Sequence, residues 1–125
     1  MRLRALTVAA AFAVTLGSAS AGGASGSDGG TPARRPVIVR MGDFFFRPKV
    51  VTVHVGEEVR FVNTGKIQHT VADTDAHGHI RSRLIRPRPL EPGQLQVVRF
   101  TKPGRISYLC TFHPTLMRGR IDVVR

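Results

Sequence analysis

The sequence has a single cysteine, no tryptophan, one tyrosine and only eight acidic residues. A single cysteine excludes an internal disulfide, so the chain is not a disulfide-stabilised scaffold. No nucleic-acid-binding motif is present, and there is only one tyrosine and no tryptophan on which bases could stack. We therefore expect no nucleic-acid partner for this small basic protein.

The charge of the chain is strongly one-sided. Nineteen basic residues against eight acidic ones give a net charge of +11 at pH 7. Such a charge favours anionic surfaces or acidic partner proteins. The arginines are scattered over the chain, with one real cluster at 81–88, so a surface that merely keeps the protein solvated is the simpler interpretation.

The N-terminus has the three parts of a secretory signal peptide. Arg2 and Arg4 form a positive region, residues 5–16 are mostly apolar and rich in alanine, and small residues follow at 19–21. A stretch of twelve residues is too short to span a bilayer, which needs about 20. We predict a signal peptide at 1–21, cleaved after Ala21. The mature protein then has no membrane span and is periplasmic, secreted or associated with the cell envelope.

Residues 22–35 are mostly glycine, serine and alanine. Such a stretch buries no apolar surface, and we predict a disordered linker. The folded part is then one domain at 36–125, which is large enough for a single small core. In an exported protein an unpaired thiol is a liability unless it is buried, coordinated or reactive, so Cys110 is expected to have a role.

The domain is rich in β-branched residues and in short alternating runs. These runs, separated by glycine and proline turns, predict an all-β sandwich without long helices. Residues 74–93 contain three prolines and several arginines, and predict a long loop with a short strand near 83–85. The other predicted strands are 37–41, 49–55, 58–63, 68–72, 95–101, 105–110 and 119–124.

Three soft metal ligands lie close together near the C-terminus. Cys110, His113 and Met117 bring a thiolate, an imidazole and a thioether into eight residues. This set suits copper better than magnesium, calcium or manganese, and a thioether is a poor zinc ligand. They lie on a loop between two predicted strands, and His69, at the start of another, is the best candidate for a second imidazole.

Each of these residues also has a structural interpretation. Cys110 could be an inert core thiol, His69 a strand histidine bonded to a backbone carbonyl, and Met117 a filler of core space. A single copper site built from these three residues and His113 is the simpler explanation, and it predicts one copper ion. A second cluster of Asp73, Asp75, His77 and His79 could bind a metal weakly, but an exposed loop explains it better.

The chain resembles a small cupredoxin of the plastocyanin and amicyanin group over residues 39–124. The motifs that carry the resemblance are MGDFFFRP at 41–48, VTV at 51–53 followed by GE, VRFVN at 59–63, QHTV at 68–71, LEPG at 90–93, FTKPG at 100–104, and YLCTFHP at 108–114 followed by MRG. The resemblance implies a single-domain Greek-key β-sandwich. It also implies that His69, Cys110 and His113 are equatorial copper ligands and that Met117 is the axial one.

Two positions depart from the family pattern. Three residues separate His113 from Met117, where amicyanin-like members typically have two and plastocyanin-like members four. Thr70 follows the first histidine, where the family often has an asparagine that bonds across to the ligand loop. These departures affect the tuning of the site more than the choice of metal.

The expected function is the transfer of single electrons between redox partners outside the cytoplasm, by a monomer that catalyses nothing itself. No general base or free nucleophile is evident, and a copper-bound thiolate cannot attack a substrate. The expected partner is a redox protein with an acidic docking face. Two alternatives are a copper carrier or scavenger without an electron-transfer role, and a basic secreted binding module whose metal site has decayed or is structural.

Overall fold

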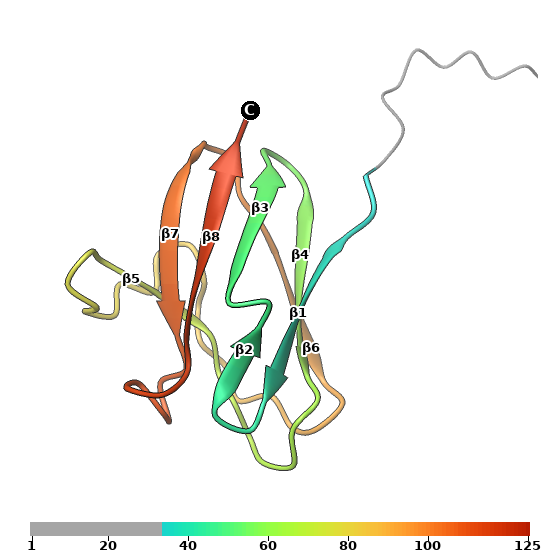
Figure 1. Ribbon diagram of the computed structural model, residues 1–125, viewed down its shortest axis with the longest axis vertical. Coiled ribbons are helices and arrows are strands. Elements are labelled where there is room, and N and C mark those ends of the chain that lie inside the picture. Colours follow the sequence, from blue (N-terminus) through green and yellow to red (C-terminus); the bar gives the residue numbers. More distant parts are fainter. Residues whose placement is uncertain (1–33) are drawn as a thin grey trace, which may run out of the picture. The chain divides into compact units, whose positions relative to one another are not determined.

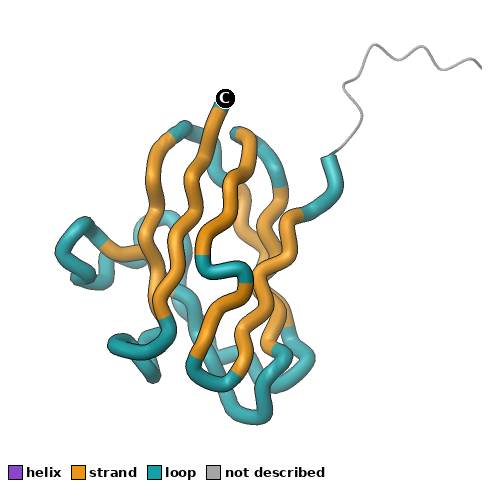
Figure 2. Tube along the Cα trace, viewed as in Figure 1, coloured by secondary structure: helices purple, strands orange, loops and turns teal. Residues whose placement is uncertain are grey.

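Eight strands form the regular structure of residues 34–125, the part of the chain that this computed structural model describes. The predicted signal peptide and all but the last two residues of the predicted linker lie outside this part. No helix occurs among the described residues (Figure 2). The strands are β1 (Val37–Gly42), β2 (Phe45–Arg47), β3 (Val50–His54), β4 (Glu58–Asn63), β5 (Ala72–Thr74), β6 (Leu95–Arg99), β7 (Gly104–Leu109) and β8 (Arg118–Val124).

The strands form two four-stranded sheets, with orders β2-β1-β4-β6 and β3-β8-β7-β5 (Figure 1). The pairs β1–β4 and β3–β8 are parallel, and the other neighbours are antiparallel. The chain passes repeatedly from one sheet to the other, so each sheet contains strands that are far apart in the sequence. The predicted all-β sandwich is confirmed.

Alternating side chains fill the space between the sheets. In β4, Val59, Phe61 and Asn63 are buried while their neighbours are half exposed. Phe61 packs edge-on against Tyr108, with 5.2 Å between ring centroids, and Phe46 contacts the same tyrosine ring at 4.8 Å. Edge-to-face packing of this kind stabilises a core beyond the area that it buries.

One strand was missed by the sequence interpretation. Residues 45–47 pair with β1, with Phe46 opposite Met41 and Arg47 opposite Arg40. Pro48 and the short length of the run hide this strand in the sequence, because a three-residue segment shows too little alternation to be recognised. The resulting β1–β2 hairpin has a two-residue turn, Asp43–Phe44, which matters for the site below.

Two predicted strands were wrong or misplaced. Residues 68–72 contain only a single bridge, between His69 and Leu90, and the paired strand β5 begins at Ala72 instead. Residues 83–85 form no strand, because the buried Asp73 carboxylate accepts the amides of Leu84 and Ile85 at 3.0 and 2.7 Å. The side chain therefore replaces a neighbouring strand as the backbone's partner.

One end of the sandwich gathers three connections from distant parts of the sequence. The β1–β2 turn, the loop 64–68 and the loop 110–117 all lie at the lower end in Figure 1, opposite the C-terminus. Hydrogen bonds join the first two, since the amide of Lys66 donates to the carboxylate of Asp43 at 2.9 Å. This end holds the candidate ligands.

Candidate metal centre

Three metal-binding side chains meet at this end of the sandwich. One donor atom from each of His69, Cys110 and His113 lies within 4.8 Å of the other two. Among residues 34–125, no other group of three or more histidine, cysteine or acidic side chains comes together in this way. The residues come from the 64–69 connection and from the loop after β7, so the convergence is a product of the fold.

The spacing of the donor atoms fits a trigonal metal site. The Cys110 sulfur lies 3.7 Å from Nδ1 of His113 and 4.0 Å from Nδ1 of His69. A metal with bonds of about 2.3 Å to sulfur and about 2.0 Å to nitrogen, at 120° to each other, separates those atoms by about 3.7 Å. The three donors are therefore placed to hold one metal ion with almost no rearrangement.

His69 is held from both its backbone and its ring. Its amide and carbonyl both pair with Leu90, at 3.1 and 2.9 Å, and its side chain is fully buried. On the ring, Nε2 lies 3.1 Å from Oδ1 of Asp43, which leaves Nδ1 facing the cysteine sulfur. The ring is thus hydrogen-bonded to a carboxylate. The alternative in which His69 is only a structural histidine predicted a bond to a backbone carbonyl instead.

Asp43 is ionised in this setting. The amide of Lys66 and then the ring of His69 hold the pKa of the Asp43 carboxyl below its usual range. An ionised carboxylate only accepts hydrogen bonds, so the proton shared with His69 belongs to Nε2. In the neutral ring, Nδ1 then carries the free lone pair, which is what a metal ligand needs.

Cys110 directly follows β7 and is completely buried. The backbone amide of Thr70 points at its sulfur from 3.4 Å, and the Thr70 hydroxyl lies 3.7 Å away. The same hydroxyl accepts the Thr111 amide at 2.8 Å and bonds to the Thr111 hydroxyl at 2.7 Å. The Thr70 hydroxyl therefore links the segment that contains His69 to the ligand loop. The cupredoxins that this chain resembles often have an asparagine at this position.

His113 lies on the ligand loop and is half-buried. The ring of Phe44 packs edge-on against it, with 4.9 Å between centroids and an angle of 87° between planes. Phe44 has a φ of 73°, in the left-handed region that bulky residues rarely adopt. Such backbone conformations persist only where the surrounding structure fixes them, and they often occur at functional sites.

Two consecutive turns shape the loop from Cys110 to Met117. The His113 amide donates to the Cys110 carbonyl at 3.2 Å, and the Met117 amide donates to the His113 carbonyl at 3.0 Å. Met117 is fully buried, whereas Leu116 is 66% exposed. The loop thus accommodates Leu116, the third residue between His113 and Met117, at the surface. Met117 itself remains buried at the end of the loop.

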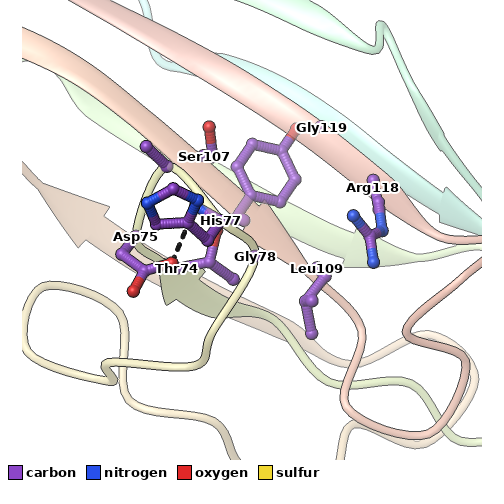
Figure 3. Close-up of a pocket in the computed structure, with 10 residues that line it drawn as sticks. Thr74, Asp75, His77, Gly78, Ser107, Leu109, Arg118 and Gly119 are labelled. Atoms are coloured by element: carbon purple, nitrogen blue, oxygen red, sulfur yellow. Dashed lines mark hydrogen bonds between the residues drawn. The ribbon is translucent and has the colours of Figure 1, made fainter.

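The second cluster predicted from the sequence does not converge in this way. Asp73 is bonded to the 84–85 backbone, while Asp75 accepts the amides of both His77 and His79 at 2.9 Å. Asp75 and His77 are among the residues that line a hollow of about 200 Å³ between the 74–78 loop and strands β7 and β8 (Figure 3). These carboxylates shape a surface loop.

Sequence reasoning missed Asp43 and Phe44 as site residues. Asp43 contacts His69 and Phe44 contacts His113, so one turn touches both imidazoles. Nothing in the local sequence pairs these residues with the histidines. The only signal was a conspicuous run of three aromatic residues at 44–46 directly after an aspartate.

Comparison with known proteins supports the same metal. The family described as copper binding proteins, plastocyanin/azurin family, matches residues 35–124. The chain belongs to this family. It is a cupredoxin of the plastocyanin/amicyanin group, its cofactor is copper, and His69, Cys110 and His113 are positioned to form a single copper site.

Individual relatives agree with this assignment. The cupredoxin is 34% identical to a copper-resistant cuproprotein CopI from Rubrivivax gelatinosus, with 99% of this chain and 95% of that protein covered. It is 31% identical to amicyanin-alpha from Methylorubrum extorquens, with 97% and 99% covered. A novel purple cupredoxin from Nitrosopumilus maritimus shares the fold with a TM-score of 0.65 and 25% identity, covering 73% of this chain and all of that one.

Within residues 34–125 there is no helix with the length and apolar character that crossing a membrane would require.

Proposed function

We propose that this cupredoxin carries single electrons between redox partners outside the cytoplasm. In this proposal His69, Cys110 and His113 would hold one copper ion, and Met117 would supply a weak thioether ligand. The observation that carries it is the meeting of two imidazole nitrogens at 3.7 and 4.0 Å from one buried thiol sulfur. That ligand set is the one that blue-copper electron-transfer proteins use.

The protein's contribution is a rigid frame. A bound copper ion would supply the one-electron chemistry, through Cu(I) and Cu(II) states that prefer different geometries. Paired backbone groups at His69, and the turns that join Cys110 to His113 and Met117, restrict how far the ligands can move. A frame that cannot relax keeps the reorganisation between the two states small, which favours fast electron transfer over ligand exchange.

The surface around His113 offers a docking face. Four apolar side chains near the turn and the ligand loop are at least 42% exposed: Phe44, Phe45, Phe112 and Leu116. Basic residues lie in neighbouring segments, including Arg47 in β2, Lys66 in the 64–68 loop and Arg118 at the start of β8. A small apolar contact suits a transient redox encounter. The positive charges would steer a partner whose own docking face is acidic.

A copper carrier or scavenger is the second candidate function. The observation that favours it is the relative named as a copper-resistant cuproprotein, of which this chain covers 95%. The same donors would then bind copper without redox cycling and release it to an acceptor. Neither role needs catalysis by the chain itself, and we propose that it is not an enzyme.

The first experiment adds Cu(II) to the purified full chain. An intense visible absorption from the thiolate bond is expected, and Cys110→Ser should abolish it, while Thr115→Ser in the same loop should not. A colourless wild-type protein would refute the copper-thiolate site. If colour appears, a reversible one-electron wave with fast self-exchange supports electron transfer, and rapid copper loss to an acceptor without such a wave supports the carrier.

We further propose an exported monomer whose leader is removed after Ala21, leaving a 22–35 linker before the domain. The support is the pattern of the first 21 residues and the unpaired cysteine. N-terminal sequencing of the protein recovered from a periplasmic or secreted fraction should begin at Gly22. Recovery of the intact N-terminus from the cytoplasm would contradict the proposal, and light scattering would test the monomer.

A further inference from the structure

The two-residue turn between β1 and β2 contacts both histidines of the copper site. Asp43 bonds to Nε2 of His69 at 3.1 Å, and the next residue, Phe44, packs its ring on His113 at 4.9 Å. The two histidine rings themselves lie 5.5 Å apart. One short hairpin turn therefore touches the outer side of each imidazole.

Asp43 is itself fixed in place. Both of its carboxylate oxygens accept the Lys66 amide, at 2.9 and 3.2 Å. Gly65 passes so close that a Cβ at that position would lie 2.2 Å from Oδ1 of Asp43. The carboxylate is therefore clamped between its own turn and the loop that leads into His69, and it cannot turn away from the ring.

Phe44 is fixed in a different way. Its positive φ of 73° sets the direction in which the side chain leaves the turn, toward the ligand loop. The ring stays 48% exposed, so core burial does not explain its position. The contact with His113 is the aromatic packing that it makes, and it restricts rotation of the one ligand that is not fully buried.

We propose that the Asp43–Phe44 turn is a positioning element that presets both imidazoles before copper binds. Asp43 holds His69 with Nδ1 free and toward the sulfur, and Phe44 limits the rotation of His113. This inference rests on the proposed copper site. It adds that the negative charge of Asp43, relayed through the ring, favours Cu(II) over Cu(I), because the more highly charged ion gains more from a more basic ligand.

The test compares two substitutions of Asp43 in the full chain. Asp43→Ala removes the acceptor, so ¹⁵N NMR of the metal-free protein should show His69 losing its single tautomer, and Cu(II) affinity should fall about 10- to 100-fold. Asp43→Asn keeps an acceptor oxygen but loses the charge. It should retain the tautomer and lower the ratio of Cu(II) to Cu(I) affinity about tenfold, which raises the potential by about 59 mV.

A matched control separates this effect from net charge and from folding. Asp75→Asn makes the same charge change at a carboxylate that bonds to His79 at 3.1 Å in a surface loop. It should leave the potential and the His69 signals unchanged. The proposal is overturned if Asp43→Asn and Asp75→Asn shift the potential equally, or if Asp43→Ala leaves the His69 tautomer intact. The NMR measurement uses the copper-free protein, so its result does not depend on whether the proposed function is correct.

Phe44 is tested through copper release. Phe44→Leu keeps an apolar side chain but loses the ring contact, and copper should leave about three- to tenfold faster, as expected for one aromatic pair. Phe45→Leu, at an exposed neighbour that packs over Gly42 instead, is the control and should leave the rate unchanged. Equal release rates for wild type and Phe44→Leu would remove Phe44 from the positioning element.

Discussion

Two carboxylate–histidine pairs in this protein have the same separation and different consequences. Asp43 and His69 are 3.1 Å apart at the copper end, and Asp75 and His79 are 3.1 Å apart in the 74–80 loop. The His69 side chain is fully buried, whereas that of His79 is 75% exposed. The distance between the partners is therefore not what makes one pair part of a metal site.

The difference lies in what each pair faces. The free nitrogen of His69 points at a buried thiol, with a second imidazole close to both. In the loop, Asp75 is occupied with the amides of His77 and His79 and with Arg81. Solvent screens the exposed pair, so it contributes little beyond shaping its own turn. A histidine becomes a ligand because of its surroundings, and the experiments below exploit that contrast.

The largest expected difference between the two regions comes from copper itself. At a free copper concentration about 1,000-fold above Kd, binding stabilises the native state by about 4.1 kcal/mol. Removal of copper should lower the thermal midpoint accordingly. Hydrogen exchange should then accelerate at 64–69 and 110–117 and stay constant at 75–79. Equal changes in both regions would mean that the 74–80 loop shares in the copper site.

Replacing one histidine from each pair gives the next largest contrast. His69→Ala removes a proposed ligand, and should weaken Cu(II) binding about 100-fold or more, the upper end of what loss of a supporting partner costs. His79→Ala should leave copper affinity and the visible spectrum unchanged. Copper titrations followed by absorption measure the affinity of both variants. Weak copper binding by the His79 variant would indicate that the second cluster also takes part in metal binding.

Two glycines test how tightly each region is built. Gly65→Ala places a methyl group against Asp43, and the overpacking should cost about 2 kcal/mol. Gly78 has a φ of 85°, and a Cβ there would meet the flexible end of Arg118 at 3.3 Å, so Gly78→Ala should cost about 1 kcal/mol, mainly through backbone strain. Denaturant unfolding gives both values. Only Gly65→Ala should also alter the visible spectrum. A spectral change in both variants would contradict the proposed difference between the copper end and the 74–80 loop.

The smallest expected effect is acid sensitivity of the loop. The amide of His79, followed by its ring, holds the pKa of the Asp75 carboxyl well below its usual range. A lowered folded-state pKa gives stability that is present above the unfolded value of about 4 and is lost as the pH falls through the folded value. Asp75→Asn should flatten this acid limb in pH-dependent unfolding, with no change in colour at pH 7.

The strand pattern and the ligand identities were readable from the sequence because both are local. Alternation in residues 58–63 directly predicts β4, and the eight-residue run from Cys110 to Met117 can only form a tight loop. By contrast, Phe45–Arg47 is too short for its alternation to be seen, and the predicted strand at 83–85 was lost to the Asp73 carboxylate. Side-chain competition for backbone groups leaves no periodic trace in a sequence.

The sequence by itself identified the candidate copper-ligand residues and the family that the chain resembles. Cys110, His113 and their spacing identify a soft copper site, because few folds or functions need that set of donors in so short a run. The tertiary structure decided what positions those donors. Asp43 meets His69 and Phe44 meets His113 only because strand pairing and loop packing bring one turn to both rings. Such contacts depend on register and backbone direction, which no local pattern records.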